Sequence, residues 1–163
     1  MYVWPVARKP RIRRDALSNT YGMVRHYADG RPKPHQGADA EAPVGTPIVA
    51  VADGRVVGIR SAGDYGIQLL LELSVPTPTG AKYAFYAHLS KTSVTVGDVV
   101  KQGHVLGATG DTGNAAGMAP EDQHLHFEAR TEPWPGTGLA GRMSPFAAFG
   151  WKFSPSTGAV TLG

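Results

Sequence analysis

The sequence contains no cysteine, and this absence excludes several kinds of protein. Disulfide scaffolds, cysteine-ligated zinc sites and thiol catalysis all depend on cysteine, so none of them applies to this chain. If the protein binds a metal ion, the ligands must come from histidine, aspartate or glutamate.

The chain also lacks a long hydrophobic run. No stretch is long and apolar enough to span a membrane, so we expect no membrane span. The first residues, MYVWPVARKPRIRR, lack the apolar segment that a secretory signal needs after its basic start. Either the sequence is trimmed, or the protein crosses membranes by another route, or it stays inside the cell.

Glycine and proline, by contrast, are abundant, with 21 and 13 residues among 163. They separate short apolar runs, a pattern typical of an all-β domain with many turns. Periodicity predicts little helix, with a short one at 144–149 as the exception. The length suits one domain with a substantial core.

Charge is distributed unevenly. Residues 1–33 carry eight basic and two acidic side chains, a net charge of +6, whereas the other 130 residues carry −3. Residues 1–20 show no apolar periodicity and are predicted to form a basic N-terminal arm. Such an arm either attracts an anionic partner, such as nucleic acid, lipid or cell-wall polymer, or is a solvated terminus.

Residues 21–163 are predicted to form a single domain, with a core at about 21–130 and a C-terminal tail, 131–163, packed on it. GIQLLLEL (66–73) is apolar enough for a central strand, and KYAFYAHL (82–89) is predicted to be its antiparallel partner. Asp53-Gly54 is a tight-turn signal between PIVAVA and GRVVGIR.

The segment HLHFE (124–128) is predicted to be a strand with a polar and an apolar face. The two faces consist of His124, His126 and Glu128, and of Leu125, Phe127 and Ala129, respectively. Two imidazoles on one face, held by apolar residues behind them, are either a metal or proton-handling site or an incidental pair, depending on which other residues join them. Glu128 is expected to orient a histidine or to form a surface salt bridge.

A second polar segment, HQGAD (35–39), supplies possible partners. A hydrolytic zinc ion needs about three protein ligands and one open position. His35, Asp39 and one histidine of the HLH pair are the obvious set. We expect Gly37 to let the chain bend so that both side chains of HQGAD converge; alternatively, HQGAD is only a polar loop.

Together these segments resemble the lysostaphin-type, or LytM-like, zinc endopeptidases that cleave peptidoglycan. The resemblance covers about Tyr21 to Arg130, with all its motifs in family order: HQGAD, APVGTPIVAVADGRVV, YAHL, VGDVVKQGHVLGATGDTGN and HLHFE. It implies antiparallel sheets in a duplicated-hybrid-motif, barrel-sandwich-like arrangement with a long groove.

The resemblance also implies the roles of the site residues. One Zn²⁺ per chain would be bound by His35, Asp39 and His126, while His88 and His124 line the groove and assist catalysis. These two histidines are expected to exchange protons with the attacking water, the oxyanion or the leaving amine.

Two further residues are predicted substrate contacts. Tyr86 would share a face with His88, although packing explains it at least as well. Asn114 follows a glycine-rich turn, and turn chemistry explains it equally well. Loops at 26–34, 61–65 and 115–123 are the expected determinants of specificity.

The implied function is hydrolysis of peptidoglycan stem peptides or cross-bridges in the periplasm or cell wall. The implied cross-links are glycine-rich bridges or D-alanine-to-diaminopimelate bonds. We expect delivery by a phage or a secretion system, possible contact of the tail with an immunity or delivery partner, and no nucleic-acid substrate.

The sequence also has features in common with three other kinds of protein. A non-catalytic cell-wall-binding or regulatory module of the same fold would normally lack one or more ligands. A lipoyl or biotinyl carrier would need a modified lysine, but Lys101 lacks the flanking pattern of those domains. A phosphocarrier would use two facing histidines and would have no use for His35 and Asp39.

Overall fold

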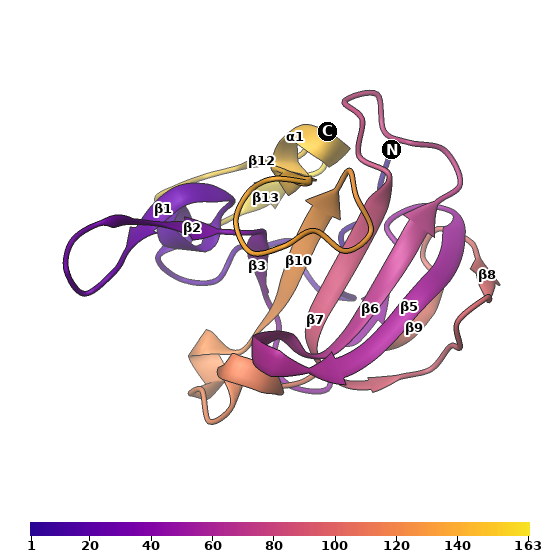
Figure 1. Ribbon diagram of the computed structural model, residues 1–163, viewed down its shortest axis with the longest axis horizontal. Coiled ribbons are helices and arrows are strands. Elements are labelled where there is room, and N and C mark those ends of the chain that lie inside the picture. The colour runs from indigo at the N-terminus through magenta and orange to yellow at the C-terminus, as the bar shows by residue number, and fades with distance from the viewer.

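The computed structural model describes residues 1–163, and antiparallel sheets dominate it (Figure 1). In the largest sheet, six strands lie side by side in the order β11-β10-β7-β6-β5-β8. These strands are β5 (Gly54–Ala62), β6 (Gly66–Leu73), β7 (Tyr83–Thr92), β8 (Val99–Val100), β10 (His124–Arg130) and β11 (Arg142–Met143). Their pairings are all antiparallel, which confirms the predicted all-β fold.

Three more strands join this sheet off the main path. They are β3 (Ala38–Glu41), which pairs with β10, and β4 (Pro47–Val49) and β9 (Val105–Thr109), which pair with each other. β9 also pairs with β7. The chain bends at Asp53-Gly54, but β4 and β5 do not pair across it, so this turn closes no hairpin.

Two small sheets and short helical turns complete the fold. The small sheets are β1 (Gly22–His26) with β2 (Pro32–His35), and β12 (Lys152–Phe153) with β13 (Val160–Thr161). The 3-10 turns are Ala16–Asn19, Gly63–Tyr65, Gly113–Ala115 and Pro120–Asp122, and the one α-helix is α1 (Pro145–Phe149).

β6 is the predicted central strand, between β5 and β7. Leu69 and Leu71 belong to the main hydrophobic core, whereas Leu70 packs on the opposite face with Phe85 and Ala87. Both faces of β6 are therefore covered along Leu69, Leu70 and Leu71, which explains this uninterrupted apolar run.

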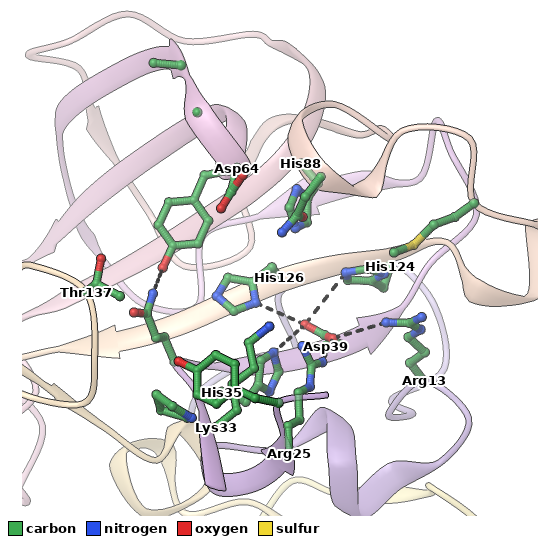
Figure 2. A pocket seen from close by; sticks show the side chains of 18 residues that line it. Arg13, Arg25, Lys33, His35, Asp39, Asp64, His88, His124, His126 and Thr137 are labelled. Atoms are coloured by element: carbon green, nitrogen blue, oxygen red, sulfur yellow. Dashed lines mark hydrogen bonds and ion pairs between the residues drawn. The ribbon is translucent and has the colours of Figure 1, made fainter. Parts of the chain in front are cut away.

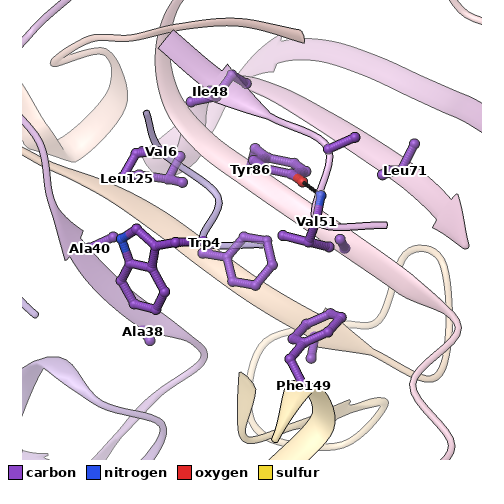
Figure 3. Packing of buried hydrophobic residues seen from close by; sticks show 14 of the residues in the cluster. Trp4, Val6, Ala38, Ala40, Ile48, Val51, Leu71, Tyr86, Leu125 and Phe149 are labelled. Carbon is purple, nitrogen blue, oxygen red and sulfur yellow. Dashed lines mark hydrogen bonds between the residues drawn. The ribbon is translucent and has the colours of Figure 1, made fainter. Parts of the chain in front are cut away.

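The apolar face of β10 lies in the main core, as its alternation predicts. Leu125 and Phe127 are at most 1% exposed, and the ring of Phe127 lies edge-on to that of Tyr86 at 5.2 Å. Figure 3 shows Leu125 near Val6 and Trp4 from the N-terminal segment. The core therefore fixes the strand that carries both histidines of the HLH pair.

The first twenty residues are not the free arm that the sequence predicts. Trp4, Val6 and Ile12 are buried in the core, and isolated bridges join Val6 to Ile48 and Ile12 to Ala40. Trp4 and Val6 are two residues apart, as in a strand, but Pro5 lies between them and the basic run Arg8-Lys9-Pro10-Arg11 separates them from Ile12, so no apolar pattern extends along the segment.

The C-terminal tail packs on the domain, mainly through aromatic rings. Phe149 and Trp151 are buried, with Phe149 5.1 Å from the ring of Tyr2 and Trp151 5.0 Å from that of Trp4. The predicted helix at 144–149 is present as α1, capped by Ser144, and no helix is long and apolar enough to cross a membrane.

Candidate active site

Three side chains from separate strands converge at the polar face of β10. Asp39 on β3 is directly opposite His126 on β10, and His35 ends β2. Oδ1 of Asp39 lies 3.0 Å from Nδ1 of His126 and 3.2 Å from Nε2 of His35. All three residues are buried, and Figure 2 shows their side chains pointing toward one another.

The chain bends at Gly37, as expected, and Gly37 also permits this convergence because the segment lies close to β10. Its φ is not positive, so it does not use the left-handed freedom of glycine. A β-carbon at this position would instead overlap the carbonyl oxygen of Phe127 and lie 2.8 Å from Cγ of Glu128. The HQGAD segment therefore approaches the backbone of β10 more closely than any side chain would allow.

Replacement of Gly37 by alanine is expected to destabilise the fold by roughly 1–3 kcal/mol, because HQGAD must move away from β10. Zinc affinity should fall as well. Gly136→Ala is the matched control: no atom lies within 4 Å of its added β-carbon, and its φ is not positive. Urea denaturation and zinc titration of both variants test this, and equal stabilities would contradict the role given to Gly37.

Backbone carbonyl groups orient three of the four histidines. Nδ1 of His35, His88 and His124 lies 2.8–2.9 Å from the carbonyl oxygens of Thr20, Thr112 and Asp122, respectively. Since a carbonyl only accepts hydrogen bonds, each Nδ1 carries a proton. In the neutral ring, Nε2 is then left with a free lone pair.

The chemistry of these atoms fits a metal ion. A neutral His35 would direct the lone pair of Nε2 at the carboxylate oxygen of Asp39, a repulsive contact unless a cation lies between them. His35, Asp39 and His126 each offer one ligand atom, a ring nitrogen or a carboxylate oxygen, and these three atoms lie within 4.8 Å of one another. Two imidazoles and one carboxylate are suitable ligands for Zn²⁺.

His88 enters the site because β7 contains a bulge. Between the pairs Leu69–Tyr86 and Ile67–Leu89, β7 has one more residue than β6, and His88 adopts φ 60°. A residue with a β-carbon rarely takes this left-handed conformation, which here turns the imidazole into the groove. Its ring centroid lies 5.3 Å from that of His124.

The same bulge overturns the prediction that Tyr86 contacts substrate. Tyr86 is fully buried in the core, on the other side of the sheet from the histidines. Its hydroxyl donates to the carbonyl of Val49 and accepts from the amide of Val51. The extra residue in β7 breaks the period of two that would have placed Tyr86 beside His88.

The polar cluster shifts the pKa values of its members. Burial alone would raise the pKa of Asp39, but the nearby His124, His35 and His126 hold it well below its usual value. Burial lowers the pKa of His88 to about 4 and also lowers the pKa of His124. At neutral pH, Asp39 is therefore charged, whereas His88 and His124 are neutral and able to accept a proton.

Glu128 forms a charged cluster next to the metal-binding atoms. It is fully buried and forms ion pairs with Arg130, at 2.8 Å, and with Arg142, while the hydroxyl of Tyr65 donates to it. Glu128 does form salt bridges, but they lie in the interior, so the prediction of a surface salt bridge is wrong. At 4.0 Å from Nε2 of His126, the carboxylate acts on that ring as a nearby charge.

Tyr65 connects this cluster to the groove. Its ring stacks on the imidazole of His126, with centroids 5.3 Å apart, and its hydroxyl accepts a hydrogen bond from Gln36. Tyr65 is expected only as part of the candidate loop 61–65, because nothing local in the sequence indicates this contact.

The convergent side chains line a cavity of about 520 Å³. Each of the three candidate loops contributes to its wall, through Tyr27, Lys33, Pro34, Asp64, Tyr65 and Met118 among others, and Asn114 lies there as well. Arg13, Arg25, Gln36 and Thr137 also line it and were not anticipated. His26 and His104 are exposed and outside this cavity, as expected.

A sequence profile for Peptidase family M23 matches residues 33–137, which include the three predicted zinc ligands and the two predicted catalytic histidines. The chain belongs to peptidase family M23. The resemblance to lysostaphin-type peptidases is thereby confirmed.

Relatives of this M23 chain include named peptidoglycan enzymes. It is 35% identical over 104 residues to the peptidoglycan DD-endopeptidase ShyB of Vibrio cholerae, covering 64% of this chain and 22% of that protein. It is 39% identical over 97 residues to the glycyl-glycine endopeptidase ALE-1 of Staphylococcus capitis, covering 60% and 25%. The chain thus spans about a quarter of the length of these relatives.

Solved structures of the family share the fold. The catalytic domain of lysostaphin from Staphylococcus simulans matches with a TM-score of 0.62 and 29% identity, over 78% of this chain and 86% of that one. A zinc-containing peptidase from Vibrio cholerae matches with a TM-score of 0.64 and 29% identity, over 83% and 39%.

Proposed function

We propose that this M23 peptidase is a zinc-dependent endopeptidase that hydrolyses peptide cross-links of bacterial peptidoglycan. The observation that supports it best is the convergence of three metal-binding atoms in a groove that also holds two neutral histidines. The relatives named as peptidoglycan endopeptidases support the substrate class. The proposed place of action is the periplasm or cell wall, and phage or secretion-system delivery remains part of the proposal.

In this proposal His35, Asp39 and His126 hold Zn²⁺. When bound, Zn²⁺ polarises a peptide carbonyl and lowers the pKa of a water molecule toward neutrality. The hydrogen bond from His35 to the carbonyl of Thr20 holds its ring in the tautomer that presents a lone pair. The nearby Glu128 carboxylate favours electron density on the ring of His126.

His88 and His124 handle protons in the proposed mechanism. Each donates its Nδ1 proton to a backbone carbonyl, so Nε2 is the basic atom available to the groove. One Nε2 accepts a proton from the attacking water and afterwards returns it to the leaving amine. When protonated, either ring can also donate to the developing oxyanion.

Replacement of His88 by alanine is expected to lower kcat by roughly 10²–10⁴-fold, the usual contribution of a positioned acid or base. Zinc content should stay at the wild-type level, because His88 is not one of the three proposed ligands. The exposed His104 supplies the control, His104→Ala, which should match the wild type. Loss of zinc together with activity in His88→Ala would instead assign His88 to the metal.

Digestion of defined muropeptides, followed by mass spectrometry, tests the proposed function. We expect cross-linked dimers to be converted to monomers with one added water, and we expect a chelator to stop the reaction until zinc is restored. A folded, zinc-loaded protein that leaves every cross-link intact would contradict the proposal. If that protein still bound sacculi tightly, the result would favour a non-catalytic cell-wall-binding module.

A further inference from the structure

The charges that line the groove are unevenly placed around Asp39. Arg13, Arg25 and Lys33 are the cationic lining residues, against the carboxylates of Asp39 and Asp64. In Figure 2, Arg13 and Arg25 approach Asp39 from the side away from Asp64. One end of the groove is therefore basic, and it remains so when Asp39 binds a metal cation.

Arg13 and Arg25 differ in how many of their guanidinium N–H groups form hydrogen bonds within the protein. Arg25 donates to the carbonyl of Ser18 at 2.8 Å, to Oδ1 of Asn19 at 3.0 Å and to Oδ2 of Asp39 at 3.1 Å. These bonds tie Arg25 to the protein. Its role is therefore to hold Asp39 in place.

Arg13, in contrast, makes one side-chain hydrogen bond, from NH1 to Oδ1 of Asn19 at 3.3 Å. Its Nε is buried and has no hydrogen-bond partner. The carboxylates of Asp39 and Asp122 lie at 3.5 and 3.7 Å, and Arg14 already binds Asp122 through two hydrogen bonds of 2.7 Å. Nε is too buried to reach a ligand, so the donors left for the groove are the two N–H groups of NH2 and the second N–H of NH1.

Arg13 also borders two cavities. It lines both the metal-site cavity and a second cavity of about 550 Å³, which share Arg13, Arg25 and Met118. Its side chain is 19% exposed, so a ligand that meets it displaces little water and is weakly screened by salt.

We propose that Arg13 is a specificity-determining residue that binds a free carboxylate of the substrate. This inference rests on the proposed function and specifies its substrate class. A guanidinium binds a carboxylate through two parallel hydrogen bonds, which adds direction to the attraction. Because Arg13 lies 3.5 Å from Asp39, the carboxylate belongs to a residue at or next to the scissile bond. Cross-links that carry such a carboxylate are preferred over amidated or glycine-only ones.

A purely electrostatic role, in which Arg13 only balances the charge of Asp39, makes a different prediction. Loss of Arg13 would then weaken zinc binding and slow every substrate equally. A recognition role changes the ratio between a carboxylate substrate and its neutral counterpart. The ratio of the two kcat/KM values therefore separates the two roles.

The experiment uses two synthetic cross-linked peptides that differ only in one group beside the scissile bond, a carboxylate or a carboxamide. We expect the wild type to favour the carboxylate by roughly tenfold or more in kcat/KM, as for a hydrogen bond to a charged group. Arg13→Gln should bring the ratio close to one, and Arg13→Lys, which keeps the charge but not the fork, should give an intermediate ratio. Arg31→Gln is the control, because the exposed Arg31 pairs with Asp29 and lines neither cavity.

Circular dichroism shows whether each variant is folded, and its zinc content shows whether the metal is bound. If Arg13→Gln is unfolded or lacks zinc, the wild type is compared with Arg13→Lys alone. Equal cleavage of both peptides by the wild type would overturn the inference alone, as would an Arg13 variant that keeps the full preference. If the folded, zinc-loaded wild type cleaved neither peptide, the proposed function would fail and the inference with it.

Discussion

Replacement of His126 by alanine is expected to abolish both zinc binding and peptide hydrolysis. His126 supplies one of the three convergent ligand atoms, and the remaining His35 and Asp39 cannot by themselves complete a hydrolytic site. Loss of the metal removes several kcal/mol of transition-state stabilisation. If that loss is about 4 kcal/mol, the rate falls by about 1,000-fold or more.

Zinc stoichiometry, measured by elemental analysis beside activity on muropeptides, tests this expectation. His104→Ala again serves as the control, since that histidine is exposed and outside the groove. A second comparison, with His124→Ala, separates ligands from proton-handling groups: this variant should keep its zinc and lose rate. Full zinc occupancy in His126→Ala would mean that another set of residues binds the metal.

Replacement of Glu128 by glutamine is expected to destabilise the protein by roughly 3–5 kcal/mol, the range for breaking a buried ion pair. Arg130 and Arg142 would be left without their charged partner; their side chains are only 2% exposed. Glu72→Gln is the matched control, an exposed strand glutamate that should change stability by at most about 0.5 kcal/mol. Both variants are compared by urea denaturation in the presence of a chelator, so that metal binding does not contribute.

Glu128 also makes a prediction about pH. Burial alone would raise its pKa, but His126, Arg130 and Arg142 together lower it from 4.5 to about 2. Because the folded pKa is depressed, the stabilisation is complete above about pH 4.5 and is lost as the pH falls toward 2. The wild type should thus lose stability across this window more steeply than Glu128→Gln. Parallel curves would show that Glu128 is not charged in the folded protein.

Much of the metal site could be predicted because it depends on local patterns. The alternation of HLHFE places His126 and its neighbours on opposite faces, and in the structure Leu125 and Phe127 do lie in the core. The HQGAD segment brings His35 and Asp39 together across a bend at Gly37, as its sequence predicts. Predictions of this kind are correct where the strand is regular, because successive side chains then alternate between its two faces.

The remainder depends on contacts that no local pattern records. A single extra residue in β7 sends Tyr86 into the core and His88 into the groove. Arg13 reaches the groove from a segment without periodicity, held by the pairing of Ile12 with Ala40. The hydroxyl of Tyr65 donates a hydrogen bond to Glu128, which is 63 residues away in the sequence. Long-range packing decides each of these placements, so the sequence alone could not supply them.

Aromatic contacts made by the C-terminal residues limit how far this protein can be truncated and which part of it can be moved into another protein. The family-defining region, 33–137, carries the proposed metal ligands, but Phe127 behind His126 packs on Phe149 and Trp151, which lie outside it. The carbonyl that orients His35 belongs to Thr20, also outside. Recombination that moved the family region alone would therefore transfer the ligands without the cover that keeps them in register. A fragment that keeps the site intact must therefore be longer than the region that matches the family.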